Sequence, residues 1–416
     1  MTLTHRSPQS TPPPRRRRRS AVPLLGGLVV GVLGSLLVSP ASASVPPPAA
    51  VAAPATPAPE PAPPLTGLAL GPDRLPECTA VVASMTPRAR LAQRLMVGVQ
   101  GDDPAGTAET VRQTQVGGIF VGGNATTLLT NQSLRGVQAA SRIPLTVAVD
   151  DEGGRVQRVD QLDGDLPSAR SLATTKTPLE VRDIARDRAR KLVARGITMN
   201  MAPDVDVSDQ PAGDVIGDRS FSNDPLTVST YAAAYALGQR EVGIFTVLKH
   251  FPGHGHASGD SHQGRVTTPP LARLRADDLR PYGTLLGRTG PLREEGGRGR
   301  TAVMVGHLDV PDLTTDLPSS LTPAVSQLLR RQYGFDGLVL TDDLGAMKAI
   351  TDEFTLPEAV QKALGAGADM ALWTSGGKVT PVLDALSQAL SSGQLDSAAN
   401  DKAVIRILSA KGLCSR

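Results

Sequence analysis

Short apolar runs recur along the chain from about residue 95, and segments with a different apolar spacing separate them. Each run is bounded by glycine or polar residues, which is typical of strands that are buried on both faces of a parallel sheet. We predict eight strands, at residues 95–99, 117–121, 145–149, 197–201, 245–249, 302–306, 338–341 and 370–373.

The intervening segments place apolar residues three and four apart with charges between them, which is the period of an amphipathic helix. Residues 179–196 and 227–243 are examples. Gly196, Gly243 and Gly334 each precede a predicted strand, where a helix C-cap favours a left-handed residue. Strands that alternate with helices predict an α/β fold.

Eight such strand–helix units over residues 75–416 predict a (β/α)8 barrel of the TIM type that forms a single domain. An open, doubly wound parallel sheet is the alternative. Because no glycine-rich fingerprint follows the first predicted strand, we do not expect a dinucleotide cofactor.

The residues that precede this domain have a different composition. Residues 15–19 are all arginine, an apolar stretch spans 21–38, and Ala-Ser-Ala at 41–43 offers a cleavage site. This order of parts predicts a secretory signal peptide at 1–43, with an uncleaved membrane anchor as the alternative. Residues 44–74 are rich in proline and alanine and predict a disordered linker. We therefore expect a secreted or cell-envelope protein.

The charge balance changes when the predicted signal peptide is set aside. The whole chain carries 43 Lys and Arg residues against 40 Asp and Glu residues, a formal charge of +3. Residues 1–43 hold six arginines and no acids, which leaves 37 basic against 40 acidic side chains and a charge of −3. We therefore expect no nucleic-acid partner, and a membrane contact only if the signal stays uncleaved.

The chain has two cysteines, Cys78 and Cys414, at opposite ends of the predicted domain. In an exported chain these residues predict a disulfide between the first and last elements, provided that the ends of the domain lie close together. Two free thiols are the alternative.

Charged or imidazole side chains follow four of the predicted strands. These are Asp150, the pair Lys249-His250, His307, and the pair Asp342-Asp343. In a closed barrel the carboxyl ends of the strands meet at one mouth, where catalytic residues collect. The sequence therefore predicts one polar site at this mouth.

Four of the six histidines lie in KHFPGHGHASGDSH, residues 249–262. A metal site is one interpretation, but glycines interrupt the run and its spacing matches no zinc signature. We predict proton transfer instead, with no metal and no cofactor. Asp260 and His262 are two residues apart, so in an extended loop their side chains share one side and the carboxylate can orient the imidazole.

The motifs KHFPGHG, Asp-Ser-His, DEGGRVQR, IGDRSF and LTDDLGAM resemble those of the β-N-acetylhexosaminidases of glycoside hydrolase family 3, in that family's order, over residues 80–410. The resemblance implies a catalytic barrel domain and a retaining, two-step hydrolysis of terminal β-linked N-acetylglucosamine. Together with export, it implies that the substrates are peptidoglycan fragments.

The same resemblance implies roles for individual residues. Asp342 would be the nucleophile, and His262 the acid/base with Asp260 as its orienting partner. Asp343 would face the other side of its strand, and Glu152 and Arg155 would brace their loop. The side chains that would hold the sugar hydroxyls and the N-acetyl group are Asp150, Arg158, Arg219, Lys249 and His250.

Two other functions stay open at this point. A histidine acid/base would not repel phosphate, so the enzyme could be a phosphorylase of the same glycosides. A non-catalytic amino-sugar-binding protein on the same barrel is the third hypothesis, because a fold does not fix a function. The glycine-rich, charged stretch 287–300 predicts a surface insertion at one rim of the site.

Overall fold

A computed structural model describes residues 75–124, 126–293 and 299–416. The predicted signal peptide at 1–43 and the predicted linker at 44–74 lie outside the described residues. Of the predicted insertion, residues 287–293 form bends and turns after α10, and Leu292 within them is buried.

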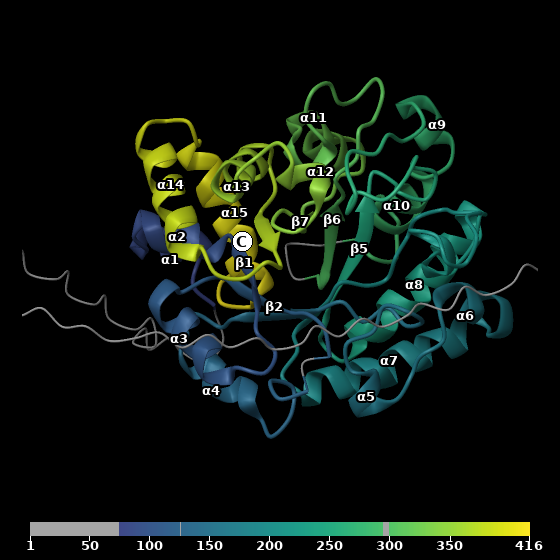
Figure 1. Ribbon diagram of the computed structural model, residues 1–416, viewed down its shortest axis with the longest axis horizontal. Coiled ribbons are helices and arrows are strands. Elements are labelled where there is room, and N and C mark those ends of the chain that lie inside the picture. Colours follow the sequence, from purple (N-terminus) through teal and green to yellow (C-terminus); the bar gives the residue numbers. More distant parts are fainter. Residues whose placement is uncertain (1–74, 125, 294–298) are drawn as a thin grey trace, which may run out of the picture. The chain divides into compact units, whose positions relative to one another are not determined.

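Eight parallel strands close into a barrel in the order of the chain, which confirms the predicted (β/α)8 fold and excludes the open sheet (Figure 1). The strand bounds differ in places from the prediction: β2, β3 and β4 are shorter, β5 extends to Phe251, and β7 reaches both aspartates at its end. The strands are β1 Leu95–Val99, β2 Gly118–Val121, β3 Thr146–Val149, β4 Met199–Asn200, β5 Phe245–Phe251, β6 Thr301–Val305, β7 Leu338–Asp343 and β8 Met370–Trp373.

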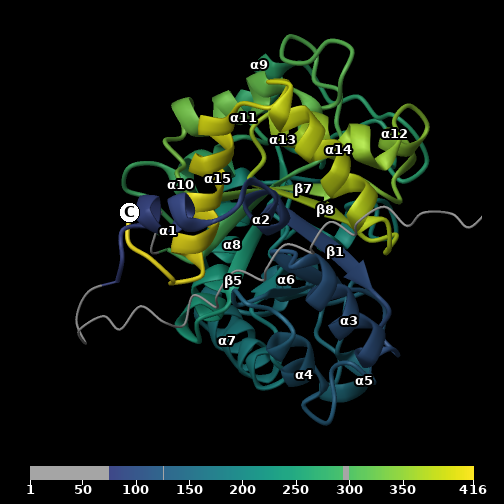
Figure 2. The same ribbon diagram turned by 90° about the vertical axis from the view of Figure 1, so that its left-hand side faces the viewer.

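Helices surround the barrel, as the two views at right angles show (Figures 1 and 2). Their bounds are α1 Cys78–Ser84, α2 Pro87–Gln93, α3 Pro104–Thr114, α4 Ser133–Ala139, α5 Asp160–Asp163, α6 Ala169–Thr175, α7 Pro178–Ala194, α8 Pro225–Glu241, α9 Leu271–Ala276, α10 Arg280–Leu286, α11 Pro323–Gln327, α12 Lys348–Thr351, α13 Leu356–Gly365, α14 Val379–Ser391 and α15 Ser397–Ala410. Short 3₁₀ turns span Gly217–Arg219 and Ser319–Leu321, and a π-helical turn spans Leu328–Gln332.

The two longest helices show how the sequence sets helix ends. The α7 helix begins with a capping box, in which Thr177 and Glu180 each accept a hydrogen bond from the other's backbone N–H, and with a proline at its first turn. The predicted terminating glycines have left-handed backbones, with φ of 90° at Gly196, 85° at Gly243 and 63° at Gly334. A left-handed glycine ends a helix without the steric cost of a Cβ atom.

The core divides into a barrel interior and a layer between the strands and the helices. Along β1, Met96 points into the barrel, where it packs with Phe120, Met199 and Met304, whereas Leu95 faces the helices. Successive strand side chains alternate between faces, so every strand contributes to both layers. The interior below the mouth is thus filled by apolar side chains, and the polar site must lie above them.

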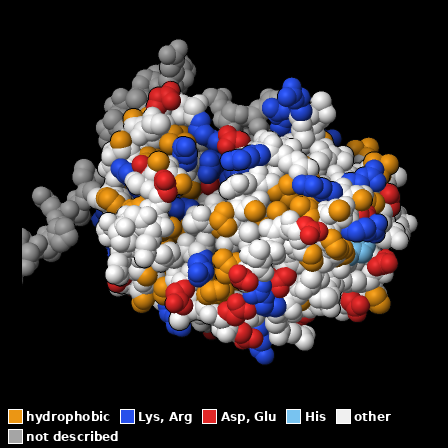
Figure 3. Space-filling model, turned by 90° about the horizontal axis from the view of Figure 1, so that it is seen from above, with side chains coloured by type: hydrophobic (Ala, Val, Ile, Leu, Met, Phe, Trp, Pro, Cys, Tyr) orange, Lys and Arg blue, Asp and Glu red, His pale blue; other side chains and the backbone are white. Residues whose placement is uncertain are grey.

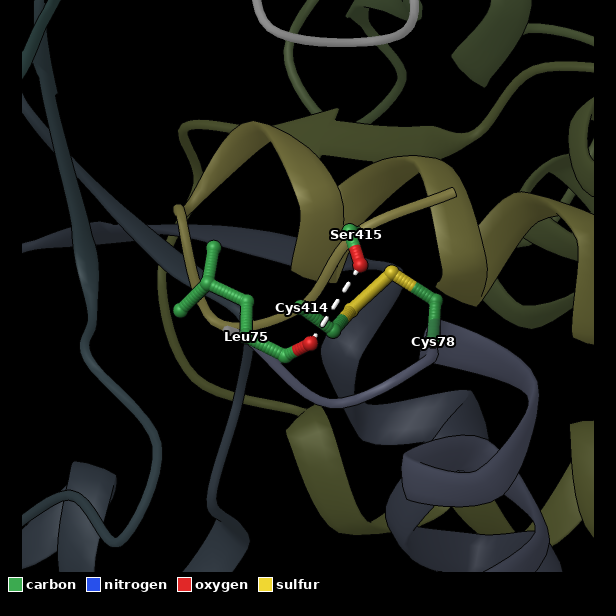
Figure 4. The surroundings of a disulfide bond; sticks show 4 residues. All are labelled: Leu75, Cys78, Cys414 and Ser415. Carbon is green, nitrogen blue, oxygen red and sulfur yellow. Dashed lines mark hydrogen bonds between the residues drawn. A yellow bond between two sulfur atoms is a disulfide. The ribbon is translucent and has the colours of Figure 1, made fainter. Parts of the chain in front are cut away.

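The predicted disulfide is present. Cys78 at the start of α1 and Cys414 after α15 are bonded, with 4.9 Å between their Cα atoms (Figure 4). The backbone N–H of Cys78 also donates to the carbonyl of Ser415 at 2.9 Å. The two ends of the domain are therefore adjacent, as the disulfide prediction required.

The described surface has mixed charge. Figure 3 shows acidic and basic side chains interspersed over one face of the described residues. In the described part of the chain, no helix is both long and apolar enough to cross a membrane.

Replacing Cys78 and Cys414 by serine should destabilise the domain. The disulfide joins residues 336 positions apart, so its loss frees a long loop in the unfolded chain. We expect the free energy of unfolding to fall by about 2–5 kcal/mol, seen as a lower urea midpoint. A reductant should lower the midpoint of the native protein and leave that of the double variant unchanged. Equal midpoints for all samples would contradict this expectation.

Candidate active site

A cavity of about 400 Å³ opens at the carboxyl ends of the strands. Its wall contains every side chain predicted for the site except that of Asp260. Asp260 lies on the same loop as His262 and contacts the His262 ring. The structure therefore brings together the predicted residues from the ends of β3, β5 and β7. Those lining the cavity are Asp150, Arg158, Arg219, Lys249, His250, His262 and Asp342.

The ammonium group of Lys249, at the end of β5, is buried between two carboxylates. Its Nζ lies 2.5 Å from Asp150 Oδ1 and 2.5 Å from Glu152 Oε1. Burial alone would lower the pKa of Lys249, but the charges of Asp150 and Glu152 outweigh it, so the pKa is raised. Lys249 is therefore charged at neutral pH, and it ties the end of β5 to the loop after β3.

Arg219, from the loop after β4, completes this network. It binds both carboxylate oxygens of Glu152, at 2.8 and 2.9 Å. Burial opposes ionisation of Glu152, but the charges of Arg219 and Lys249 outweigh it and lower the pKa of the carboxyl. Arg155 donates to the backbone carbonyls of Val215 and Ile216, at 3.1 and 3.2 Å. The expected bracing by Glu152 and Arg155 is thus present.

The two glycines of the DEGGR stretch, Gly153 and Gly154, allow the loop after β3 to turn sharply. Gly153 and Gly154 have φ of 105° and 58°, which disfavour any residue with a Cβ. A Cβ at Gly153 would also lie 2.4 Å from the carbonyl oxygen of Pro167. Glycine at 153 therefore lets the loop pack closely enough to present Asp150 and Glu152 to Lys249.

His250 is held by a carboxylate that the sequence analysis missed. Its Nδ1 lies 2.7 Å from Asp206 Oδ2, and the other oxygen of Asp206 accepts from the backbone N–H groups of His250 and His254, at 3.2 and 2.7 Å. Burial lowers the pKa of His250 to about 4. The ring is therefore neutral, with its proton on Nδ1, and its Nε2 faces Arg219 Nη2 at 3.5 Å.

Asp204 lies beside this pair. Burial, reinforced by the charge of Asp206, raises the pKa of Asp204 well above its ordinary value. Burial raises the pKa of Asp206 as well, but the hydrogen bonds from the His250 and His254 N–H groups oppose that rise, so of the two carboxyls Asp204 is the one that holds a proton more tightly. Ligand atoms of Asp204, Asp206 and His250 come within 4.8 Å of one another, but Asp206 and His250 satisfy each other, and we assign no metal here.

The signal that could have found both acids is their position shortly after the fourth predicted strand. They stand in MAPDVDV, where Ala202 and Pro203 separate Asp204 from the end of that strand and Val205 separates the two acids. Both acids are buried, Asp204 at 2% and Asp206 at 0% exposure. A charge that is not at the boundary of an apolar run is easily taken for part of a loop.

The site contains two pairs of adjacent aspartates, Asp150-Asp151 and Asp342-Asp343. The first residue of each pair lines the cavity, and the second accepts hydrogen bonds from neighbouring protein groups. Asp343 accepts from the backbone N–H groups of Gly345 and Thr374, at 2.8 and 3.0 Å. The prediction that Asp343 serves the structure is consistent with these bonds, although Asp343 also borders the cavity.

The Asp342 carboxylate is fixed and ionised. Its Oδ1 accepts from the backbone N–H of Asp343 at 2.8 Å, which leaves Oδ2 for a ligand. Burial would raise its pKa, but the neighbouring His250 and His307, the Asp343 N–H and the Lys249 ammonium outweigh burial and lower the pKa. An anion is thus maintained in a largely enclosed site.

His262 lies on the loop after β5 and has a different environment. Its Nδ1 is 2.8 Å from Asp260 Oδ1, and the same oxygen accepts the His262 backbone N–H at 2.9 Å. The side chain is 67% exposed. Asp260 therefore sets the orientation of the ring, while Nε2 is available to a ligand in the cavity or to water.

His307, His256 and Trp373 make contacts with the protein framework. His307 is buried, with Nδ1 2.7 Å from Ser320 Oγ and Nε2 3.0 Å from the carbonyl oxygen of Asp343. His256 binds Asp278 at 2.9 Å, away from the cavity. Trp373 is fully buried in the layer between strands and helices, where it belongs to the core.

An anionic carboxylate and an oriented imidazole at the mouth of a (β/α)8 barrel are groups that enzymes use for nucleophilic and acid–base chemistry. The model of the glycosyl hydrolase family 3 N-terminal domain matches residues 86–410. The chain belongs to this family, and it is a glycoside hydrolase.

Individual relatives agree with this assignment. The beta-hexosaminidase LpqI of Mycobacterium tuberculosis is 48% identical over 343 residues, which cover 81% of this chain and 85% of the relative. A solved glycosyl hydrolase family 3 structure from Mycobacterium smegmatis has 51% identity and a TM-score of 0.75, covering 80% of this chain and 99% of the other. A beta-N-acetylhexosaminidase structure from Beutenbergia cavernae has 27% identity and a TM-score of 0.67, with coverages of 79% and 99%.

Acid should destabilise the folded protein through His250. Its folded-state pKa of about 4 lies below the ordinary 6.5, so the unfolded chain binds more protons between these values, and stability is lost as the pH falls through them. A difference of this size corresponds to on the order of 3 kcal/mol. His250→Asn keeps an N–H donor toward Asp206 but cannot titrate. Urea midpoints at about pH 7 and about pH 4.5 should therefore differ less in this variant than in the native protein.

His256→Asn is the matched control. In the native protein, the hydrogen bond with Asp278 is the main cause that raises the pKa of His256. The stabilisation that His256 contributes is therefore complete at acid pH and is lost as the pH rises through the raised pKa. The control should therefore be at least as sensitive to acid as the native protein. If His250→Asn were as acid-sensitive as the native protein, the buried imidazole would not be the cause.

Proposed function

We propose that this glycoside hydrolase releases terminal β-linked N-acetylglucosamine with retention of configuration, with Asp342 as nucleophile and His262 as acid/base. The observation that carries the proposal is that both side chains line one cavity at the barrel mouth. The names of the relatives, beta-hexosaminidase and beta-N-acetylhexosaminidase, support the substrate class.

In the first step Asp342 Oδ2 attacks the anomeric carbon as the glycosidic C–O bond breaks. The Asp343 N–H occupies Oδ1 at 2.8 Å, so the attacking oxygen is defined. The protonated imidazole of His262 gives its Nε2 proton to the leaving oxygen and keeps its Nδ1 proton toward Asp260. The products of this step are a covalent glycosyl-enzyme and the free aglycone alcohol.

In the second step the neutral His262 takes a proton from water at Nε2. The hydroxide attacks the anomeric carbon, the bond to Asp342 breaks, and both catalytic groups return to their starting states. A histidine can fill both roles because imidazole titrates near neutral pH. Asp260 acts through His262, because it orients the ring and stabilises the imidazolium of the first step. It is therefore a positioning residue.

Charged and polar side chains around the cavity are proposed to hold the sugar. Directional donors and acceptors are needed to orient the hydroxyl and acetamido groups of a pyranose. Lys249 and Arg219 supply charged N–H donors, and Asp150 supplies acceptor oxygens. Arg158, whose Nη2 lies 3.8 Å from Asp150 Oδ2, and His250 complete the set.

We further propose that the enzyme is exported and acts on peptidoglycan fragments at the cell envelope. The order of parts in residues 1–43 supports export. The disulfide between Cys78 and Cys414 supports an oxidising compartment. An exported enzyme of this specificity would meet N-acetylglucosamine chiefly in wall material.

Asp342→Ala should abolish hydrolysis of an aryl N-acetyl-β-glucosaminide, with a loss in kcat of about 10³-fold or more, because no nucleophile remains. The native enzyme should release the β-anomer first, as seen by proton NMR, and free sugar rather than sugar 1-phosphate when phosphate is added. Asp352→Ala, an exposed acid after α12, is the control and should stay active. Native-like activity of Asp342→Ala would remove the assignment.

His262→Ala should affect substrates according to their leaving group. For a disaccharide we expect a loss of about 10²–10⁴-fold in kcat, because the leaving oxygen needs a proton. A dinitrophenyl glycoside needs none, so its first step should stay fast, and a burst of phenolate should reveal accumulated glycosyl-enzyme. Azide should then restore turnover of that glycoside, because it attacks without a base. Equal losses for both substrates, with no burst, would contradict the acid/base role.

A further inference from the structure

The loop after β5 closes on itself on either side of His262. The backbone N–H of Ser258 donates to the carbonyl of Thr267 at 2.8 Å, and the N–H of Thr267 donates to Ser258 Oγ at 3.0 Å. Residues 259–266 between them form the tip of the loop, and His262 lies in the middle of this tip. The position of the proposed acid/base therefore depends on what holds the tip.

Contacts within the tip cannot fix its position relative to Asp342. In the described part of the chain, the His262 ring hydrogen-bonds only to Asp260, which belongs to the same tip. Asp260 therefore sets the orientation of the ring and not the distance from the ring to the proposed nucleophile. Contacts between the tip and other loops must set that distance.

Arg265, three residues after His262, joins the tip to two other loops. Its Nε and Nη2 donate to the two carboxylate oxygens of Asp309, at 2.9 and 2.6 Å. Its Nη1 donates to the two oxygens of Glu353, at 2.9 and 3.1 Å, and to the carbonyl oxygen of Asp316 at 2.8 Å. All three nitrogens of the guanidinium group are thus engaged, and the group bridges the loop after β6 and the segment after β7.

The geometry of these bonds suits an arginine that holds a loop in place. A guanidinium group that binds both oxygens of a carboxylate fixes the relative orientation of the two groups as well as their distance. The Arg265 side chain is 31% exposed, and a single ion pair at such a position adds little to stability. Because two carboxylates from separate loops share this one cation, its main effect is on the position of the tip.

Two backbone hydrogen bonds connect the tip to the same parts of the chain. The Asp309 N–H donates to the carbonyl of Val266 at 2.8 Å, and the Ala349 N–H donates to the carbonyl of Ser261 at 3.1 Å. Among the polar side chains of the tip, all of them within the described residues, only that of Arg265 is hydrogen-bonded to either neighbouring loop. A substitution of Arg265 therefore loosens the tip and leaves its backbone contacts in place.

We propose that Arg265 is a positioning residue, which holds His262 within reach of the glycosidic oxygen when the sugar lies beside Asp342. The proposal rests on the proposed function, because it takes His262 as the acid/base. Glu353 follows β7, whose end carries Asp342, so the ion pair ties the acid/base to the segment that carries the nucleophile. Arg265 does not line the catalytic cavity, so it acts through His262 and not by touching the sugar.

Arg265→Ala should affect substrates according to their need for a proton. For the β-1,4-linked disaccharide of N-acetylglucosamine we expect kcat/KM to fall by about tenfold or more, because a displaced acid protonates the leaving oxygen poorly. For the dinitrophenyl glycoside, whose leaving group needs no proton, kcat/KM should stay within about twofold of the native value. Activity on the second substrate also reports that the variant is folded.

The double variant His262→Ala/Arg265→Ala separates positioning of the acid/base from general packing. If Arg265 acts only through His262, its loss has no further effect once His262 is absent. The double variant should then match His262→Ala on the disaccharide within about twofold. A merely structural role would instead lower the activity by the same factor in both backgrounds.

Arg195→Ala is the matched control. Arg195 also binds both oxygens of one carboxylate, that of Asp163, at 2.7 Å each, and neither residue lines the catalytic cavity. The control should behave as the native enzyme with both substrates.

Equal losses on both substrates in Arg265→Ala, no loss on either, or a further loss in the double variant would overturn the proposal. Failure of the proposed function would look different, because His262→Ala itself would then treat the two substrates alike.

Discussion

The buried ammonium of Lys249 is the charge around which the mouth of the barrel is organised. Burying such a group costs several kcal/mol unless it is paired and hydrogen-bonded. Asp150 and Glu152 compensate it, and Arg219 shares Glu152. Because Asp150 and Glu152 follow β3, Arg219 follows β4 and Lys249 lies in β5, their mutual attraction fixes two loops against a strand. Loss of one partner would leave an unpaired charge in the site and release more than one loop.

This network also determines which groups are charged when a sugar enters. Lys249 and Arg219 stay cationic because carboxylates surround them, whereas burial keeps His250 neutral. Asp342 stays anionic in the same enclosure, where an isolated carboxylate would tend to protonate. The site therefore presents the Asp342 anion among donors that suit hydroxyl and amide oxygens, as the proposed attack at carbon requires. In the proposed mechanism, proton transfer is the task of His262, at the rim.

The barrel was predictable because buried parallel strands appear as separate apolar runs, and all eight runs form strands. The candidate nucleophile and Lys249 were predictable because they stand where such runs end. Asp204 and Asp206 were not found, because apolar neighbours surround them in MAPDVDV. A cavity of about 640 Å³ beside the catalytic cavity could not have been found from the sequence, because its wall joins residues 210–215 and 257–263, and no local pattern shows that these segments meet.

The proposed nucleophile and the proposed acid/base have opposite environments, and the proposed tasks explain why. A nucleophile must be ionised and precisely placed, and Asp342 stands at the end of a strand, with Asp343 bonding that end to the next strand through Thr374. An acid/base must exchange a proton with solvent in every cycle, and His262 is correspondingly 67% exposed. Its orientation relies on one carboxylate, Asp260, two residues away in the same loop. A local Asp–His pair can stay correctly oriented even if its loop shifts when a substrate binds, which a contact with the barrel itself could not ensure.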